Sequence, residues 1–489
     1  MTSPAYDTPE TLRIVTLNCW GLKYIAKYRN ERLTEIGNQL ARSDPAPDIV
    51  GLQECWTQQD YLAIREKTRH ILPYGKFYYS GIFGGGLAIL SRWPIEESSM
   101  YRYPLNGRPS AFFRGDWFVG KGVACARIRY GSGRKDVAEV FCTHLHAPYE
   151  REPNDSYLCH RTAQAWEMAK LLRHAAERGH LVISLGDFNM VPLSLAHRII
   201  ETHSPVRDVW RLLRPNSSLG AASQPAERRR GRKVPTAEDN LEVNGATCDS
   251  CLNTWRWSKP LRKRLNRGED VVVELDTEDP KAKRLDYIFF SCGEKSPRAA
   301  GDVDSDGGRE DDAAGPEWTV ESANVGMTGR HPTLKCSLSD HFSVEATLWR
   351  RNHQLQPTVS TATDASAFPR ADTAHSARLP VAVYDEILEL IRTYNLREVR
   401  QRKVRLAHFV AQVTLAVGCL VGVWWAPRNY VAFLLMLWST LGLSAGVIDG
   451  LIGGLFVGSE LRALWEFEWE VRTAREAALL LEEKKKLEG

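Results

Sequence analysis

The stretch HLVISLGDFN, residues 180–189, is an apolar run typical of a β-strand, and it ends in an acid and an amide. Six similar apolar runs occur between residues 12 and 349: LRIVTL (12–17), DIVGL (48–52), GLAILS (86–91), VAEVFCTHL (137–145), LDYIFF (285–290) and FSVEATLW (342–349). Between two of them, residues 161–178 place Trp166, Leu172 and Ala176 at helical spacing. Strands that alternate with helices predict a layered α/β domain.

The composition of the chain narrows its function. The 489 residues include 64 Lys and Arg against 60 Asp and Glu, a net charge of +4, which does not indicate a nucleic-acid partner. A hydrophobic content of 43% excludes a mostly disordered chain. The ten cysteines are scattered, several of them inside apolar runs, which favours reduced thiols in a protein that faces the cytosol. Cys248 and Cys251 form a lone CxxC, which is too little for a zinc or redox site.

The C-terminal quarter has a different character. Residues 351–380 form a polar stretch rich in Ser, Thr, Ala and Pro, which predicts a linker. Two runs without Lys, Arg, Asp or Glu follow, at 406–426 (21 residues) and 430–448 (19 residues). Pro427–Asn429 separates them. Each run is long enough to cross a hydrocarbon core of about 30 Å, so the sequence predicts a transmembrane helical hairpin.

Basic residues give the expected orientation of this hairpin. They cluster at 392–405 before the first span and at 462–486 after the second, whereas only Arg428 lies between the spans. The positive-inside rule therefore places both ends, and the large N-terminal domain, in the cytosol. Asp449 is expected where the second span meets the cytosolic face. The tail at 458–489 is expected to be an amphipathic helix on the membrane surface or against another chain, which leaves a homo-oligomer open.

Polar side chains follow the ends of the apolar runs. They are Asn18, Glu54, His144, Asp187, Asn189, Asp286, Asp340 and His341. Each of these residues alone has an ordinary structural explanation, such as a turn cap, a surface carboxylate or a hydrogen-bonded core histidine. Loops at strand ends can bring residues that are distant in sequence into one pocket. The ordered set as a whole therefore points to a single site.

The order Asn…Glu…His…Asp-x-Asn…Asp…Asp-His resembles that of the DNase I-like endonuclease/exonuclease/phosphatase superfamily. Over about residues 12–349, the resemblance implies a four-layered α/β sandwich that cleaves phosphoesters with a divalent metal. Hard oxygen ligands suit Mg²⁺, and Glu54 is expected to be the principal ligand, with Asn18 beside it. The family pattern implies that His341 takes a proton from the attacking water, with Asp340 or Asp187 holding its ring.

The remaining residues of the set also receive roles from this resemblance. His144 and Asn189 would bind the phosphoryl oxygens and stabilise the charge that grows on them. Asp286 would orient another member of the set by a hydrogen bond.

Residues 103–128, YPLNGRPSAFFRGDWFVGKGVACARI, resemble a Gly- and aromatic-rich segment of neutral sphingomyelinases and of the fungal inositol phosphosphingolipid phospholipases C. In that family the segment carries an Asp and a Lys five residues apart, which here are Asp116 and Lys121. The aromatic residues could enter lipid, and the charge pair could change partners when anionic lipid arrives. An ordinary surface hairpin with a weak ion pair is the alternative. The segment lacks GxxxxGK[ST], so it does not predict an ATP site.

These resemblances imply a Mg²⁺-dependent phospholipase C that releases ceramide and a phosphorylated headgroup, with anionic phosphatidylserine or cardiolipin as activator. The expected location is the endoplasmic reticulum or the mitochondrial outer membrane. A nuclease or inositol polyphosphate phosphatase of the same superfamily, and an inactive membrane scaffold, remain alternatives. Neither the headgroup nor the oligomeric state follows from the sequence.

The expected domain layout has five parts: a catalytic domain at 1–350, the linker at 351–380, a basic helix at 381–405, the spans within 406–457 and the tail. Residues 220–240 and 296–317 are rich in Ala, Gly, Pro, Asp and Arg, and are expected to be mobile surface insertions.

Overall fold

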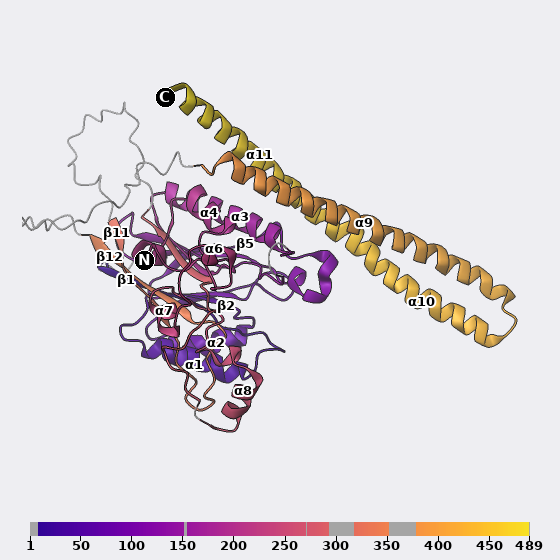
Figure 1. Cartoon of the computed structure of the whole chain (residues 1–489). Coiled ribbons are helices and arrows are strands. Elements are labelled where there is room, and N and C mark those ends of the chain that lie inside the picture. Colours follow the sequence, from indigo (N-terminus) through magenta and orange to yellow (C-terminus); the bar gives the residue numbers. More distant parts are fainter. Residues whose placement is uncertain (1–7, 151–153, 270, 293–316, 352–377, 489) are drawn as a thin grey trace, which may run out of the picture. The chain divides into compact units, whose positions relative to one another are not determined.

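A computed structural model describes residues 8–150, 154–269, 271–292, 317–351 and 378–488 (Figure 1). The chain divides into two compact units. The first comprises Met1–Tyr103, Gly120–Ala147 and Gln164–Ala377. The second comprises Pro104–Val119, Pro148–Ala163 and Arg378–Gly489, so it takes two short segments from sequence expected to belong wholly to the catalytic domain.

The first unit contains two β-sheets, each of six strands among the described residues. One has the strand order β11-β12-β1-β2-β4-β3, with bounds Glu317–Gly326, Ser343–Arg351, Thr11–Asn18, Ile49–Gln53, Leu87–Ser91 and Tyr74–Tyr78. The other has the order β5-β6-β7-β8-β10-β9, with bounds Ile95–Arg102, Gly122–Arg129, Val137–His144, Leu181–Asp187, Asp286–Ser291 and Arg207–Asp208. Each sheet has a parallel pair near its middle, β1 with β2 and β7 with β8.

The alternation of apolar residues explains how these sheets pack. Leu12 and Ile14 on one face of β1 belong to a core cluster shared with the other sheet. Val15 and Leu17 on the opposite face belong to a second cluster, which includes helix residues. Gly51 of β2 lies where the two sheets approach, because a Cβ there would be 1.8 Å from the Leu185 side chain of β8. The sheets therefore form a sandwich with its main core between them.

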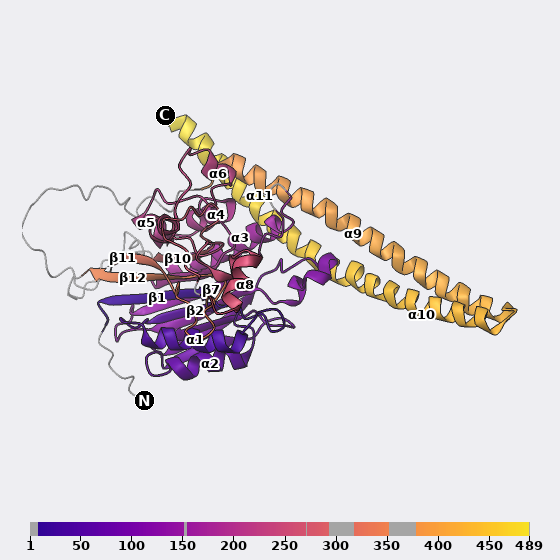
Figure 2. The same cartoon turned by 60° about the horizontal axis from the view of Figure 1, so that its bottom comes forward.

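Helices cover the outer faces of this sandwich. The helices α1 (Arg29–Arg42) and α2 (Gln58–Thr68) lie on one side, and α3 (Leu158–Glu177) and α4 (Leu195–His203) on the other (Figure 2). Thr57 and Asp60 begin α2 with a capping box, in which each side chain accepts the other's backbone N–H. On the opposite side, the His197 ring of α4 packs on Phe289 of β10 at 5.5 Å. The four-layered α/β sandwich expected from the sequence is confirmed.

Short helices occupy the long connections of this unit. They are α5 (Val209–Leu213), α6 (Pro225–Arg228), α7 (Ala237–Glu242), η3 (Thr254–Arg256) and α8 (Lys259–Asn266). All ten cysteines lie in the described part of the chain, and none of them forms a disulfide there. The insertion at 296–317 lies outside the described residues except at its last position, and the linker at 351–380 does so except at its ends.

The prediction of a mobile insertion at 220–240 is wrong. This segment contains α6 and α7, and Thr236 and Asp239 begin α7 with a capping box. The buried Glu227 carboxylate accepts hydrogen bonds from the Arg230 and Arg232 side chains and from the backbone N–H of Leu219. Basic residues that look like a solvated run in the sequence therefore neutralise a buried acid.

The second unit is built around three long helices. They are α9 (Val381–Gly422), α10 (Asn429–Leu451) and α11 (Val457–Glu488), joined by η6 (Val423–Trp425) and the π-helical turn η7 (Ile452–Phe456). The helices α9 and α10 run side by side as a hairpin in both views (Figures 1 and 2). Their most apolar 18-residue windows have mean hydropathies of 1.9 and 2.0, with only 11% and 6% of each window buried. A soluble core helix would bury such a surface. We therefore treat the apolar windows of α9 and α10, and not the whole helices, as candidate membrane spans.

Small residues let α10 approach α9 closely. A Cβ on Gly446 would be 2.6 Å from the Gln412 Cβ, and one on Gly450 would be 2.9 Å from the Phe409 ring. At the end of this contact, Asp449 accepts hydrogen bonds from Arg405 and, at 2.7 Å, from His408 if its Nδ1 carries the proton. Asp449 therefore pairs with two residues of the other helix in the hairpin.

Replacing Gly446 with leucine is expected to separate the hairpin, because the new side chain would occupy the space of Gln412. Overpacking of this kind destabilises by about 1–3 kcal/mol. Disulfide cross-linking between cysteines introduced on facing turns of α9 and α10 measures the loss of contact. Gly418→Leu is the matched control, because no heavy atom lies within 4 Å of a Cβ at Gly418. Equal cross-linking in both variants would contradict this packing.

The second unit also buries a group of ionisable side chains. The Glu398 carboxylate of α9 lies 3.8 Å from the Arg108 guanidinium and accepts a hydrogen bond from Ser110 at 3.4 Å. The Glu460 carboxylate of α11 accepts a hydrogen bond from the Tyr394 hydroxyl and lies 3.2 Å from His160 Nε2. This cluster joins α9 and α11 to both short segments, 104–119 and 148–163.

Candidate active site

The strand register brings three of the expected site residues into one row. His144 at the end of β7 is paired with Asp187 at the end of β8, and Asp187 is paired with Asp286 at the start of β10. In the other sheet, Asn18 at the end of β1 pairs with Gln53, and Glu54 follows directly. The Asn18 Nδ2 group donates a hydrogen bond to Asp187 at 3.0 Å and so links the two sheets at this end.

His341 lies in the loop before β12, and Asp286 fixes the orientation of its ring. The Nδ1 atom of His341 lies 2.8 Å from an oxygen of Asp286, and that same oxygen accepts a hydrogen bond from the Thr247 hydroxyl at 2.5 Å. The expectation that Asp340 or Asp187 holds the ring is wrong. Asp187 lies 4.0 Å from the opposite nitrogen, and Asp340 pairs with Arg256 at 3.3 Å instead.

The charges around His341 change its proton affinity. Burial alone lowers the pKa of His341, but the surrounding negative groups, with Asp286 the strongest, outweigh burial and raise the pKa well above its ordinary value. The Nε2 atom is therefore the part of the ring left to exchange a proton, because Nδ1 is engaged by Asp286.

Asp187 lies at the centre of the group. One of its oxygens accepts the hydrogen bond from Asn18 and lies 3.4 Å from His144 Nε2, and the other accepts the backbone N–H of Asn189 at 2.9 Å. Burial and then the Asp286 carboxylate raise the pKa of Asp187 to about 7. Burial, with the positive charges of Lys121 and His341, lowers the pKa of His144 well below its ordinary value. His144 is therefore neutral at pH 7.

Glu54 is suited to bind a cation. Its Oε1 atom accepts a hydrogen bond from Asn18 at 3.2 Å, whereas the buried Oε2 atom has no hydrogen-bond partner among the described residues. Burial and the Asp340 carboxylate raise the pKa of Glu54, so a positive charge placed here would favour the carboxylate form. A buried carboxylate oxygen without a partner, near a second carboxylate, fits a hard divalent ion.

Two further observations bear on a metal. The Asn18 amide oxygen accepts the backbone N–H of Trp20 at 3.0 Å, which leaves its second lone pair for a cation. One ligand atom from each of Asp187, Asp286 and His341 lies within 4.8 Å of the others, so this group could also hold an ion. Because the Nδ1 of His341 is hydrogen-bonded to Asp286, the same group also has the geometry of a histidine that is oriented for proton transfer.

The other predicted residues lie as follows. Asn189 has a positive φ of 47° and donates from Nδ2 to the Leu145 carbonyl at 3.0 Å. Lys121 donates to the same carbonyl at 3.1 Å. Asp116 lies in the second unit, where it hydrogen-bonds with Tyr149. The two residues of the expected charge pair, Asp116 and Lys121, therefore belong to different units.

Three residues at this site were not predicted from the sequence. Thr247 supports Asp286 from a loop, Arg256 pairs with Asp340, and Trp20 directs its backbone N–H to Asn18. Of these, only Trp20 carried a signal, because it lies three residues beyond the end of the predicted strand at 12–17. Thr247 and Arg256 lie in connections without periodicity, so nothing in the sequence marked them.

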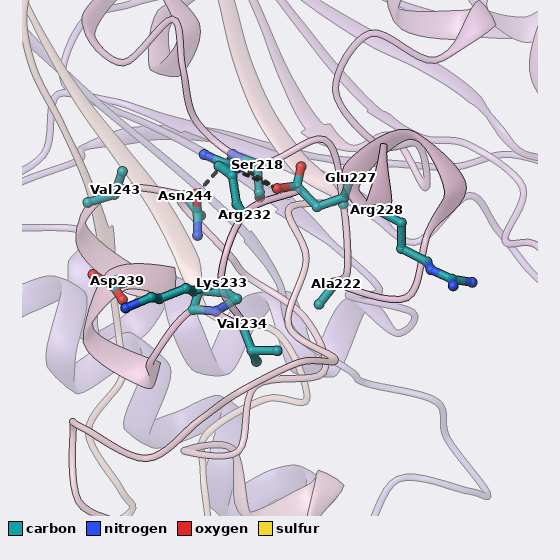
Figure 3. Close-up of a pocket in the computed structure, with 12 residues that line it drawn as sticks. Ser218, Ala222, Glu227, Arg228, Arg232, Lys233, Val234, Asp239, Val243 and Asn244 are labelled. Atoms are coloured by element: carbon teal, nitrogen blue, oxygen red, sulfur yellow. Dashed lines mark hydrogen bonds and ion pairs between the residues drawn. The ribbon is translucent and has the colours of Figure 1, made fainter. Parts of the chain in front are cut away.

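A separate cavity lies beside residues 220–240, the segment that was expected to be a mobile insertion. It has a volume of about 370 Å³ and is lined by residues that include Ser218, Arg232, Lys233 and Asn244 (Figure 3). Its lining contains none of the predicted site residues. Arg232 is already engaged by Glu227 and by the Asn216 carbonyl. We therefore do not assign this cavity to catalysis.

Comparison with known proteins identifies the family of this chain. The model of the Endonuclease/Exonuclease/phosphatase family matches residues 15–341. An inositol phosphosphingolipids phospholipase C from Schizosaccharomyces pombe is 37% identical, over 94% of this chain and 93% of the relative. The protein of that name from Saccharomyces cerevisiae is 32% identical, over 95% of this chain and 90% of its own. Human sphingomyelin phosphodiesterase 2 is 38% identical over 41% of this chain and 46% of its own.

The solved structures that resemble this chain are more distant in sequence than these relatives. A sphingomyelinase C from Streptomyces griseocarneus is 17% identical with a TM-score of 0.41, covering 70% of this chain and 99% of its own. A beta toxin from Staphylococcus aureus is 17% identical with a TM-score of 0.42, covering 68% and 99%. The family match and the full-length relatives place this chain in the endonuclease/exonuclease/phosphatase family, in its branch of phosphoric diester hydrolases that comprises the inositol phosphosphingolipid phospholipases C and neutral sphingomyelinases.

Proposed function

We propose that this protein is a Mg²⁺-dependent phospholipase C that hydrolyses the phosphodiester of sphingolipids to ceramide and a phosphorylated headgroup. The observation that carries the proposal is the similarity to a phospholipase C over 94% of the chain, which includes the C-terminal helices. The geometry supports it, because Asn18, Asp187 and His341 lie within a few ångströms of one another in the first unit.

The roles of the residues follow from their contacts. His341 accepts a proton from water at Nε2, because Asp286 occupies Nδ1 and fixes the ring. The water oxygen attacks phosphorus as the bond between phosphorus and the ceramide oxygen breaks. The ceramide oxygen takes up a proton from solvent and leaves as a hydroxyl, and His341 returns its own proton to solvent. His144 and Asn189 lie beside Asp187 and contact the phosphoryl oxygens. A divalent cation bound by Glu54 and Asn18 would supply positive charge that neutralises the phosphoryl oxygens and lowers the pKa of a nearby water and imidazole.

The headgroup is proposed to be phosphoinositol rather than phosphocholine, because the relatives that match over the whole chain carry that name. The deciding experiment is hydrolysis of inositol-phosphoceramide and sphingomyelin side by side by the full chain. Each substrate is offered in vesicles with and without phosphatidylserine, and with Mg²⁺ or EDTA. Release of ceramide that EDTA abolishes and Mg²⁺ restores is the expected result. Cleavage of plasmid DNA or of inositol polyphosphates with no ceramide release would instead favour the nuclease or phosphatase alternative.

Activation by anionic phospholipid, phosphatidylserine or cardiolipin, is part of the proposal. The basic stretch 392–405 lies directly before the first candidate span, and each Lys or Arg near an anionic surface contributes about 1 kcal/mol. In the segment that carries Asp116, Phe112 and Phe113 are 47% and 75% exposed, so their rings are available to lipid. Equal turnover in neutral detergent and in phosphatidylserine vesicles would contradict this activation.

The membrane topology is proposed on the same basis. Two spans with both ends in the cytosol place the active site on the cytosolic side, at the endoplasmic reticulum or the mitochondrial outer membrane. Homo-oligomers through α9, α10 or α11 remain a further proposal. Protease protection of sealed membranes tests the orientation: both the N-terminal domain and α11 should be digested from the cytosolic side.

Replacing Asp286 with asparagine is expected to lower activity by about 10- to 100-fold, because the amide cannot orient and stabilise the protonated His341 ring as a carboxylate does. The loss should be smaller than that for removal of the imidazole itself, and the pH optimum should shift. Initial rates on vesicles from pH 6 to 9 measure both effects. Asp276→Asn, in an exposed loop of the same unit, is the control. An unchanged pH profile would contradict the orienting role of Asp286.

A further inference from the structure

Two tryptophans pack against each other beside the proposed metal site. The ring centroids of Trp20 and Trp255 are 4.7 Å apart at an angle of 55°. The backbone of Trp20 donates to the Asn18 amide oxygen, and the Trp255 indole N–H donates to the Ser337 carbonyl at 2.8 Å. Both side chains are only partly buried. They therefore offer an aromatic surface next to a residue of the site.

A buried cation fixes this surface. The Arg32 guanidinium lies 4.7 Å from the Trp20 ring centre and 5.7 Å from that of Trp255. It donates hydrogen bonds to four backbone carbonyls, those of Cys19, Trp20, Lys27 and Leu338. Because Arg32 is fully buried and four of its five N–H donors are hydrogen-bonded, the rings cannot move away from it easily. Both indole rings already interact with the positive charge of Arg32. A second cation that bound on these rings would therefore gain less cation–π energy.

Arg256, the next residue after Trp255, lies beside the catalytic loop. Its Nε atom is 2.9 Å from Asp249 and its Nη2 atom is 3.3 Å from Asp340, the residue before His341. Its side chain is 38% exposed, and its Nη2 atom also donates to the Cys248 Sγ atom at 3.5 Å, whereas no hydrogen bond from Nη1 occurs within the described part of the chain. The Asp249 and Asp340 carboxylates therefore hold the Arg256 guanidinium, and its Nη1 group remains available to donate hydrogen bonds to a ligand.

We propose that Trp20, Trp255 and Arg256 form a headgroup subsite for an uncharged polyhydroxylated ring. This inference rests on the proposed phospholipase C function and assigns the residues that select the headgroup. A polyol ring offers C–H groups that pack on aromatic rings and hydroxyl oxygens that accept from a guanidinium. A quaternary ammonium would instead meet the positive charges of Arg32 and Arg256. The subsite therefore favours phosphoinositol over phosphocholine.

The test compares the two headgroups in the same variant. Arg256→Ala is expected to lower kcat/KM for inositol-phosphoceramide at least tenfold and to change that for sphingomyelin much less, so the ratio of the two should fall. Arg256→Lys, which keeps the charge but loses the fork, should give an intermediate ratio. Arg264→Ala is the matched control, because Arg264 forms an exposed ion pair with Glu269 at 2.7 Å on the neighbouring helix. This control should leave the ratio unchanged.

A second readout does not depend on turnover of a lipid. Inhibition by myo-inositol 1-phosphate should weaken at least tenfold in Trp255→Leu and in Arg256→Ala, whereas inhibition by phosphocholine should not. An equal loss with both headgroups would overturn the subsite and leave Arg256 a purely structural partner of Asp340. If the unaltered enzyme hydrolyses neither sphingolipid, the proposed function fails, and that outcome is distinct from an unchanged ratio in the variants.

Discussion

Replacing His341 with alanine is expected to lower kcat for ceramide release by about 10²–10⁴-fold, the usual contribution of a positioned acid–base group. The physical reason is that Nε2 of this ring is the nitrogen free to exchange a proton, while Asp286 holds Nδ1 at 2.8 Å. Asp187 is no substitute, because its oxygens are engaged by Asn18 and Asn189. Single-turnover hydrolysis of inositol-phosphoceramide in vesicles measures the loss.

The same variant should still bind vesicles, because the candidate spans and the basic stretch are unchanged. His70→Ala, at an exposed position of the same unit, is the control and should retain full activity. A variant at His341 that keeps more than a tenth of the turnover would exclude the base role. If the unaltered protein and the His341 variant are both inactive on every phosphoester offered, the inactive scaffold becomes the better hypothesis.

The second unit is expected to lose stability as the pH rises from about 6.5 to 8.5. Burial and then the neighbouring Glu460 raise the pKa of Glu398 to about 7, and burial raises that of Glu460 to about 8. Arg108 lies within the cluster and offsets only part of this effect. In the unfolded chain both carboxyls lose their protons near pH 4.5. The folded unit therefore holds more protons in this pH window, and its free energy of unfolding falls as the pH rises.

The titration of His160 sets the lower end of the pH range over which this loss of stability can be measured cleanly. Burial lowers its pKa to about 3, so the folded unit keeps the ring neutral. The unfolded chain binds a proton at His160 below about pH 6.5, and this opposes the carboxyl effect at acidic pH. The clean test therefore lies above pH 6.5. Because a difference of one in pKa corresponds to about 1.4 kcal/mol, the expected loss is of the order of a few kcal/mol.

Hydrogen exchange of residues 104–119 and of α9 and α11 in detergent measures this stability. Corrected protection factors should fall between pH 6.5 and 8.5 in the unaltered chain. Glu460→Gln should make the profile flatter and raise protection at pH 8. Glu466→Gln, at an exposed position on the same helix, is the control and should follow the unaltered chain. Protection that rises with pH in this window would contradict a buried, proton-binding pair.

The sequence predicted the fold, and it marked a group of polar residues that the structure brings together, for a simple physical reason. Strands buried on both faces are continuous apolar runs, so the polar residue that ends each run is conspicuous. It could not predict which carboxylate holds His341, because that depends on the lateral register of β8 and β10. That register places Asp286 opposite Asp187. Thr247, which donates a hydrogen bond to Asp286, comes from a loop whose sequence has no periodicity.

Local composition misled the prediction in two places. The segment around Glu227 has the composition of a mobile loop, yet a buried carboxylate and two arginines order it. Residues 103–128 were expected to form a loop with a charge pair whose aromatic residues could enter lipid, but within it Trp117 packs on Phe456 at 4.3 Å and Arg108 faces Glu398. The contacts of this second segment join residues hundreds of positions apart, and no window of sequence contains both partners.

The division of the chain has a practical consequence for anyone who wishes to obtain a soluble enzyme. Truncation at residue 350 would remove α9 and α11, which supply Glu398 and Glu460, from the interior that the segments 104–119 and 148–163 share with them. Arg108, now 5% exposed, would lose its ionic partner Glu398, and the fully buried His160 ring would lose its contact with Glu460. The Trp117 ring would lose Phe456. A shortened enzyme should therefore retain α9 and α11 and replace only the lipid-facing side chains of the hairpin.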